Sequence, residues 1–177
     1  MNPIPIIAAL GLVTTLAAAP VLAASDNIKF DGAIGSQPLR SGPAVNTVQG
    51  VNPGGIPWVI RTFKAHIKTD GSISAQGDGL LLGGGNTIGA RGGTRFVVAS
   101  LFCPGQTNPY NSGAADLDVN GDFDIKGPLL NANGAPPSFP CGDSLDNRPV
   151  LLIRSATVDA NGVATPGNWF AAGILKD

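Results

Sequence analysis

The sequence predicts an all-β fold: a single-domain antiparallel β-sandwich of about eight strands, with a β-barrel as the alternative. The 177 residues include 25 Gly and 15 Pro, and the 12 acidic residues are all Asp. Gly and Pro interrupt helices and Glu favours them, so this composition opposes helix formation. After residue 23, the longest stretch without Gly or Pro is 58–70, where apolar and polar residues alternate as in a half-buried strand.

Residues 1–23 have the features of a secretory signal peptide. They carry no charged side chain, consist mostly of Ile, Leu, Val and Ala, and end in small residues. Cleavage is expected after Ala23, and cleavage after Ala24 fits nearly as well. An uncleaved anchor is the alternative, but three prolines and the small-residue end favour cleavage. We therefore expect a secreted, extracellular protein with a single β domain over residues 24–177 and no membrane span after cleavage.

The strands follow from hydrophobic periodicity. Alternation of apolar and polar residues predicts half-buried strands on either side of residues 69–71 and of residues 119–121. Residues 96–102 and 150–153 are continuous apolar runs, which are typical of strands in the middle of a sandwich. In chain order, the expected strands are 27–33, 58–68, 72–82, 94–103, 114–119, 122–126, 150–159 and 163–174.

Three Asx-Gly pairs predict hairpin turns, at Asp70-Gly71, Asn120-Gly121 and Asn161-Gly162. A three-residue loop at 119–121 pairs Leu117 with Phe123 and keeps the apolar residues on one face, which a two-residue loop does not. The same reasoning gives a loop at 69–71. We therefore predict type I turns with Gly71 and Gly121 in the left-handed conformation at a G1 bulge. At Gly162 both loop lengths fit the flanking residues.

Cys103 and Cys141 are the only cysteines, and export makes a disulfide between them the expected state. Four long connections interrupt the strands, and a binding surface is expected on them. These connections are 35–57, 83–93, 104–113 and 127–148.

The hairpin around residue 120 contains the candidate metal site. Its predicted register places Asp116 opposite Asp124 and Asp118 opposite Asp122, and like charges opposed across a sheet repel each other. A hard cation, a neighbouring Lys or Arg, or water should compensate. The string Asp116-x-Asp118-x-Asn120-Gly121 matches the first half of a calcium loop, although Gly127 stands where an EF-hand needs Glu. We thus predict a candidate Ca²⁺ site at Asp116, Asp118, Asp122 and Asp124, with a solvated polar face as the alternative, and no other cofactor.

The hairpin around residue 70 carries a basic outward face. Lys64, His66 and Lys68 lie across from Gln76, Ser74 and Ser72 in the predicted register. This face either binds an anionic glycan or an acidic partner, or is simply the solvent-exposed face of a strand. Together with the acidic hairpin, it would also allow neighbouring copies to dock head to tail.

No familiar catalytic motif accompanies these surfaces. His66 is the only histidine, and the chain has neither a Gly-x-Ser-x-Gly elbow nor a His-Glu-x-x-His motif. The glycine-rich stretch 83–93 lacks the Gly-Lys-Ser/Thr ending of a phosphate-binding loop. Trp58 and Trp169 are expected to cap the ends of the core. A net charge of -1 gives no support for nucleic-acid binding.

These observations favour a secreted, non-catalytic β-domain that is extracellular or at the cell surface. We expect a structural, adhesive or ligand-binding role, with an extracellular ligand, the matrix or a surface as its partner. The alternatives are a secreted hydrolase using a pair of Asp residues and a calcium-dependent carbohydrate-binding module. Convergence of two Asp side chains in a pocket would favour the hydrolase. An exposed Trp on a flat face would favour glycan binding.

A resemblance adds to this interpretation. The stretch Val48-Gln-Gly-Val-Asn-Pro-Gly-Gly-Ile-Pro-Trp-Val-Ile60 resembles small secreted β-proteins that share a "GV-x-PGG-x-PWVI" opening. The Asp70-Gly71 hairpin, the two cysteines, the Pro149-Val-Leu-Leu-Ile153 run and the closing Trp169-Phe-Ala171 are also similar. The resemblance covers most of residues 28–174 and implies no particular activity, because these proteins have no known function.

Overall fold

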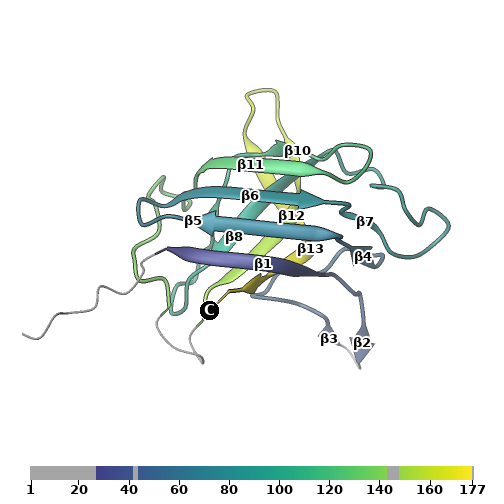
Figure 1. Cartoon of the computed structure of the whole chain (residues 1–177), viewed down its shortest axis with the longest axis horizontal. Helices are drawn as coiled ribbons and strands as arrows, with labels where there is room; N and C mark the ends of the chain where they lie inside the picture. Colours follow the sequence, from purple (N-terminus) through teal and green to yellow (C-terminus); the bar gives the residue numbers. More distant parts are fainter. Residues whose placement is uncertain (1–26, 42–43, 143–147, 177) are drawn as a thin grey trace, which may run out of the picture.

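The computed structural model describes residues 27–41, 44–142 and 148–176, and these ranges contain strands, turns and loops but no helix (Figure 1). The predicted signal peptide lies outside the described residues. The nine strands of the main sheet are β1 (Ile28–Gly35), β5 (Thr62–Ile67), β6 (Ser72–Asp78), β8 (Phe96–Phe102), β9 (Tyr110–Asn111), β10 (Ala115–Asp116), β11 (Phe123–Pro128), β12 (Val150–Val158) and β13 (Ala164–Leu175). Two small pairs join β2 (Arg40–Ser41) to β3 (Ala44–Val45) and β4 (Trp58–Val59) to β7 (Leu81–Leu82).

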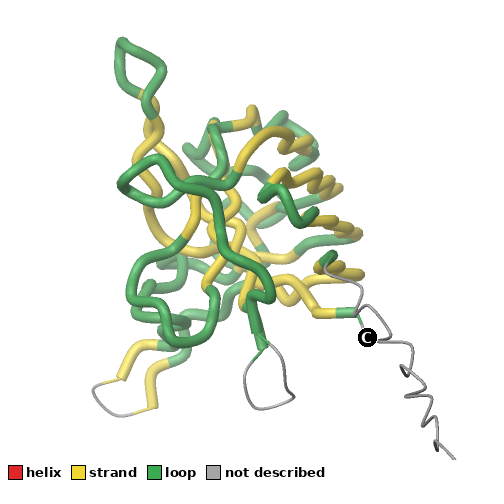
Figure 2. The backbone as a smooth tube through the Cα atoms, turned by 90° about the vertical axis from the view of Figure 1, so that its left-hand side faces the viewer, coloured by secondary structure: helices red, strands yellow, loops and turns green. Residues whose placement is uncertain are grey.

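The main sheet is antiparallel and strongly curled. Its strands follow the order β10-β8-β12-β13-β1-β5-β6-β11, with β9 beside β8. In Figure 1, β1, β5, β6 and β11 form a front layer, and β8, β12 and β13 cross behind it. The view turned by 90° shows these two layers facing each other (Figure 2). The all-β fold is therefore confirmed, and one curled sheet supplies both layers that the sequence predicted.

The core lies between the two layers and follows the predicted alternation. On β5 and β6 the residues Phe63, Ala65, Ile67, Ile73 and Ala75 are buried, whereas their neighbours in sequence point outward. β8 is buried on both faces from Val97 to Phe102, as expected for a continuous apolar run. Gly77 takes an inward position of β6, where an added Cβ would overlap the Phe123 ring. The glycine leaves the space that this ring fills.

All three predicted turns have three-residue loops. Gly71, Gly121 and Gly162 have φ angles of 80°, 81° and 81°, which is the left-handed region that glycine adopts without strain. The Lys68 N–H donates to the Ser72 carbonyl (2.9 Å), and Ile67 pairs with Ile73 as predicted. The Asp159 N–H donates to the Val163 carbonyl (3.1 Å), which resolves the register that the sequence left open at Gly162.

The predicted hairpin of 114–119 with 122–126 is wrong beyond its turn. The Asp118 N–H donates to the Asp122 carbonyl (3.0 Å), but Leu117 then bonds to the Arg95 carbonyl (2.7 Å) instead of pairing with Phe123. β10 continues along β8, and β11 pairs with β6. Each strand completes a ladder with a strand from elsewhere in the chain and no ladder joins the two to each other, an arrangement that local alternation cannot predict.

The long connection before β4 covers the outer surface of the rear layer. Pro53 forms an isolated parallel bridge with Trp169, and the Trp169 N–H donates to the Asn52 carbonyl (2.9 Å). Val48 and Val51 pack on a second cluster of buried residues that contains Phe102, Leu152 and Trp169. This part of the predicted binding loop therefore has a structural role.

The disulfide between Cys103 and Cys141 is confirmed, with a sequence separation of 38 residues. Both residues are buried at the edge of the main core. The bond joins the end of β8 to the connection that leads to β12. It therefore links two segments that are far apart in the sequence.

Candidate functional site

Each of the four carboxylates of the candidate calcium site has its own hydrogen-bond or ion-pair partners. Asp118 accepts hydrogen bonds from the Asn120 and Asp122 N–H groups (2.8 and 2.9 Å), and Asp122 accepts one from the Gly79 N–H (2.8 Å). Asp124 pairs with Lys126 (2.6 Å), and Asp116 lies 3.8 Å from Arg95. Backbone N–H donors and nearby cationic side chains thus compensate the negative charges of the acidic hairpin.

Two of these carboxyls have lowered pKa values. Hydrogen bonds from the Asp122 N–H foremost, and also from Asn120 and Gly121, lower the pKa of Asp118. The hydrogen bond from Lys126 lowers the pKa of Asp124. Within residues 27–41, 44–142 and 148–176, no three His, Cys or Asp side chains form a group that could hold a metal ion. The calcium site stays a prediction, without support from this geometry.

β10 and β11 border an open seam, which we define as residues 112–117 and 123–129. The seam is pinned at one end by the turn at Asp118 and Asp122, and at the other by two hydrogen bonds between Asn111 and Leu130 (2.8 and 3.0 Å). Between these points, no hydrogen bond joins the two described strands. The sheet therefore nearly closes on itself and leaves one gap in its ladder.

Backbone groups of both seam strands face this gap. Because Lys68 bonds to Ser72, ladder alternation directs the backbone groups of Ile73, Ala75 and Gly77 from β6 toward β11. Asp124 and Lys126 then direct their own N–H and C=O groups into the seam. On the other side of the seam, the Leu117 N–H donates to the Arg95 carbonyl. The backbone N–H and C=O groups of the neighbouring Asp116 therefore face the seam.

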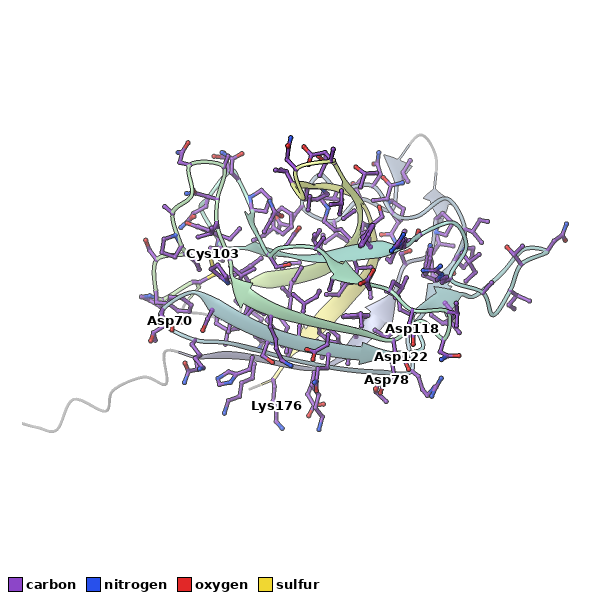
Figure 3. The ribbon with its side chains drawn as sticks, turned by 90° about the horizontal axis from the view of Figure 1, so that it is seen from above. Asp70, Asp78, Cys103, Asp118, Asp122 and Lys176 are labelled. Carbon is purple, nitrogen blue, oxygen red and sulfur yellow. A yellow bond between two sulfur atoms is a disulfide. The ribbon has the colours of Figure 1, made fainter. Side chains whose placement is uncertain are left out.

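A groove of about 1000 Å³ runs along the seam and across the outer surface of the front layer. Residues 113–116 form one wall, residues 123–126 line the bottom, and outward side chains of β5 and β6 form the other wall. The latter are Thr62, Lys64, Gln76 and Asp78. In Figure 3, Asp78, Asp122 and Asp118 lie together at one end of this layer. The groove therefore combines apolar surface with charged side chains of both signs.

The groove does not single out a catalytic pair. Asp78, Asp116, Asp122 and Asp124 all line it, which meets part of the condition for the hydrolase alternative. Asp78, however, accepts a hydrogen bond from the Thr62 hydroxyl, and the other three are held by the partners described above. A glycosidase acid requires a raised pKa, whereas the pKa of Asp124 is lowered.

The basic outward face forms as predicted. Lys64 pairs across the ladder with Gln76, and His66 pairs with Ser74. β1 lies on the other side of β5 and adds Lys29 opposite His66 and Asp31 opposite Lys64. A second pocket of about 310 Å³ lies over these residues and shares Lys64 and Gln76 with the groove. The basic and acidic residues therefore occupy one continuous face, and docking between copies stays a prediction.

Both tryptophans are in the core, as expected. Trp58 is 4% exposed and stacks on Phe170 with 3.8 Å between ring centroids, and Trp169 is 3% exposed. Neither ring is available on a flat face, so the exposed-Trp feature that would favour a carbohydrate-binding module is not met by these residues.

The sequence missed several residues of this face because they come from strands that are distant in the chain. Lys29, Asp31 and Lys176 reach it only because β1 lies between β13 and β5. Thr62, Asp78 and Lys126 lie within predicted strands, and their outward alternation was a signal that could have assigned them to the surface.

No family model matches the chain, and neither a curated protein nor a solved structure does. Within the described ranges, no helix is long and apolar enough to cross a membrane.

Proposed function

We propose that the chain is a secreted, non-catalytic extracellular β-domain that binds its ligand on the outward face of β1, β5, β6 and β11. The observation that carries this proposal is the groove of about 1000 Å³ on this face, with its exposed hydrogen-bonding side chains and unpaired backbone groups. Ligand sites are concave surfaces with a few convergent polar groups, and this groove has both features.

The two other parts of the proposal, export and a non-catalytic role, rest on different observations. The apolar segment 1–23 with its small-residue end favours export, and the Cys103–Cys141 disulfide fits an oxidising compartment. The carboxylates along the groove are engaged with separate partners, an arrangement that favours binding over acid–base chemistry. The alternative is a hydrolase that uses two of the four Asp residues lining the groove.

The test uses protein secreted from the full chain, with mass spectrometry to establish where it begins. Affinity electrophoresis against neutral and acidic soluble polysaccharides should show retardation by at least one of them. The double variant Thr62→Val/Asp78→Asn removes two exposed groups of the groove wall and should weaken that binding about tenfold or more. Thr165→Val, at an exposed position of β13, is the matched control and should bind as wild type.

Two outcomes contradict the proposal. Retardation that is equal in the groove variant and in wild type places the ligand elsewhere. Release of reducing ends that Asp78→Asn or Asp124→Asn abolishes identifies the hydrolase instead.

A further inference from the structure

We propose that the second pocket is a subsite for an oxyanion, the sulfate ester or carboxylate of an acidic polysaccharide. The inference rests on the proposed function and deepens it, because it names the chemistry of the ligand at one end of the same face. The pocket lies beside the groove, has a volume of about 310 Å³, and is lined by side chains from β1, β5, β6 and the residue after β13. This volume lies at the lower end of the range for small-ligand sites and can hold one sugar unit together with its charged substituent.

The fold brings three lysines together in this pocket from three separate elements. Lys29 lies on β1, Lys64 on β5, and Lys176 follows β13. Lys29 is the cross-strand partner of His66, and the Lys176 N–H donates to the Lys29 carbonyl (2.8 Å). Neighbouring outward side chains on adjacent strands have Cβ atoms about 5 Å apart, so these cationic groups are within reach of one ligand group.

Carboxylates do not neutralise this cluster. Asp31 is the one acidic residue lining the pocket, and it already pairs with Lys176 at 3.3 Å. Lys29 and Lys64 make no ion pair within the described ranges. Like charges on neighbouring positions repel, and a bound anion removes that repulsion while accepting charge-assisted hydrogen bonds. The pocket therefore has a positive charge that the surrounding residues leave uncompensated.

His66 supplies a second, independent observation. Its Nε2 atom is buried and has no hydrogen-bond partner, although the side chain as a whole is only half-buried. Buried polar atoms in native proteins are nearly always paired, so an Nε2 atom without a protein partner has a water or a ligand group as its partner. A neutral His66 with its proton on Nε2 would donate to an oxyanion beside Lys29 and Lys64 once the ring turns its buried edge toward the pocket.

An acidic polysaccharide fits this arrangement better than a compact anion. The pocket is open to solvent and continues into the groove through Lys64 and Gln76, so a linear chain can place a charged substituent in the pocket and its hydroxyl groups along the groove. Thr62, Gln76 and Asp78 offer the donors and acceptors that such hydroxyl groups require.

The experiment titrates the secreted, disulfide-bonded protein with dextran sulfate and with uncharged dextran, which has the same backbone. We expect binding to dextran sulfate that weakens with added salt, and little binding to dextran. Lys29→Ala/His66→Gln should reduce the affinity about tenfold or more, since two direct contacts to the anion are lost. Arg61→Ala is the matched control: it removes an exposed cation just before β5 that lines neither the groove nor the pocket, and it should bind dextran sulfate as tightly as wild type.

Three results would overturn the proposal. The first is no binding to dextran sulfate, and the second is an equal loss of affinity in Arg61→Ala and in the pocket variant, which indicates diffuse charge attraction. The third is pocket-dependent binding to phosphatidylserine vesicles without binding to dextran sulfate, which indicates a lipid surface. Binding of a neutral polysaccharide through Thr62 and Asp78 without any binding of dextran sulfate would disprove this subsite and leave the proposed function standing.

Discussion

Asp118 shows how one side chain organises a turn. Its Oδ1 accepts hydrogen bonds from the N–H groups of Asn120 and Asp122, while Gly121 takes the left-handed position that closes the loop. Asn131 makes the same two contacts with the N–H groups of Asn133 and Ala135, at a turn that the sequence analysis did not predict. The shared pattern is Asx at the first position followed by Asn-Gly, and the Asn133-Gly134 pair was the signal for it.

The turn at Asp118 should depend mainly on an acceptor at this position and only to a smaller extent on its charge. Asp118→Ala removes the acceptor and should lower the melting temperature, whereas Asp118→Asn should retain most of the stability, as the turn at Asn131 already uses an amide oxygen. Thermal unfolding by circular dichroism measures both. An equal loss in the two variants would show that the carboxylate charge itself is required.

The lowered pKa of Asp118 adds a dependence on pH. A depressed carboxyl pKa means that the stabilisation is present above the ordinary Asp value of about 3.9 and is lost as the pH falls through the lower value in the folded state. In Asp118→Asn, this part of the acid sensitivity should disappear, so its melting temperature should fall less than that of wild type below about pH 4.

At the scale of elements, the open seam results from a conflict between the turn and its flanking strands. The turn sets a register that would place Asp116 opposite Asp124, and both carboxylates would then share one outward face. In the structure they are apart, Asp116 near Arg95 and Asp124 paired with Lys126. The ladder is interrupted between two pinned ends, and repulsion between these carboxylates in the closed register would favour the open seam.

Removing both charges should close the seam. In Asp116→Asn/Asp124→Asn, we expect the backbone amides at positions 114, 116, 124 and 126 to exchange with solvent more slowly, by a factor on the order of ten, because they gain ladder partners. Hydrogen exchange followed by NMR measures each amide. Asp31→Asn, an outward carboxylate of β1, is the control and should leave these rates unchanged. Unchanged rates in the double variant would show that steric or twist constraints hold the seam open.

At the scale of the whole molecule, one disulfide joins the end of β8 to the connection before β12. The covalent link restricts the unfolded chain across 38 residues, which corresponds to about 4 kcal/mol in the chain-entropy description. The two cysteines are also 4% and 3% exposed, so the bond lies inside the packed core and not on a loose surface loop.

Loss of the disulfide should therefore destabilise the whole domain cooperatively. The double variant Cys103→Ser/Cys141→Ser should lower the free energy of unfolding by about 2–5 kcal/mol in urea denaturation. Wild type kept in a reducing agent is the matched control and should shift in the same direction. A change below about 1 kcal/mol would mean that the bond contributes little to the stability of the fold.

The sequence by itself determined the all-β class, the turns at Gly71 and Gly121, the inward and outward faces of β5 and β6, and the disulfide. These features depend on local rules: side chains alternate along a strand, and a left-handed turn position favours glycine. The same rules placed Lys64 and His66 outward and the four Asp residues around the turn at Asn120, so part of the candidate face was predictable.

Only the tertiary structure decided which strands became neighbours. β1 inserts between β13 and β5, which brings Lys29 and Lys176 to His66, and β10 leaves its hairpin partner for β8, which opens the seam beside Asp124. Strand order depends on sheet twist and on packing across the core, and these are properties of residues far apart in the sequence. For this reason the alternation along the chain predicted the faces of the strands, and the curled sheet determined which faces combine into a site.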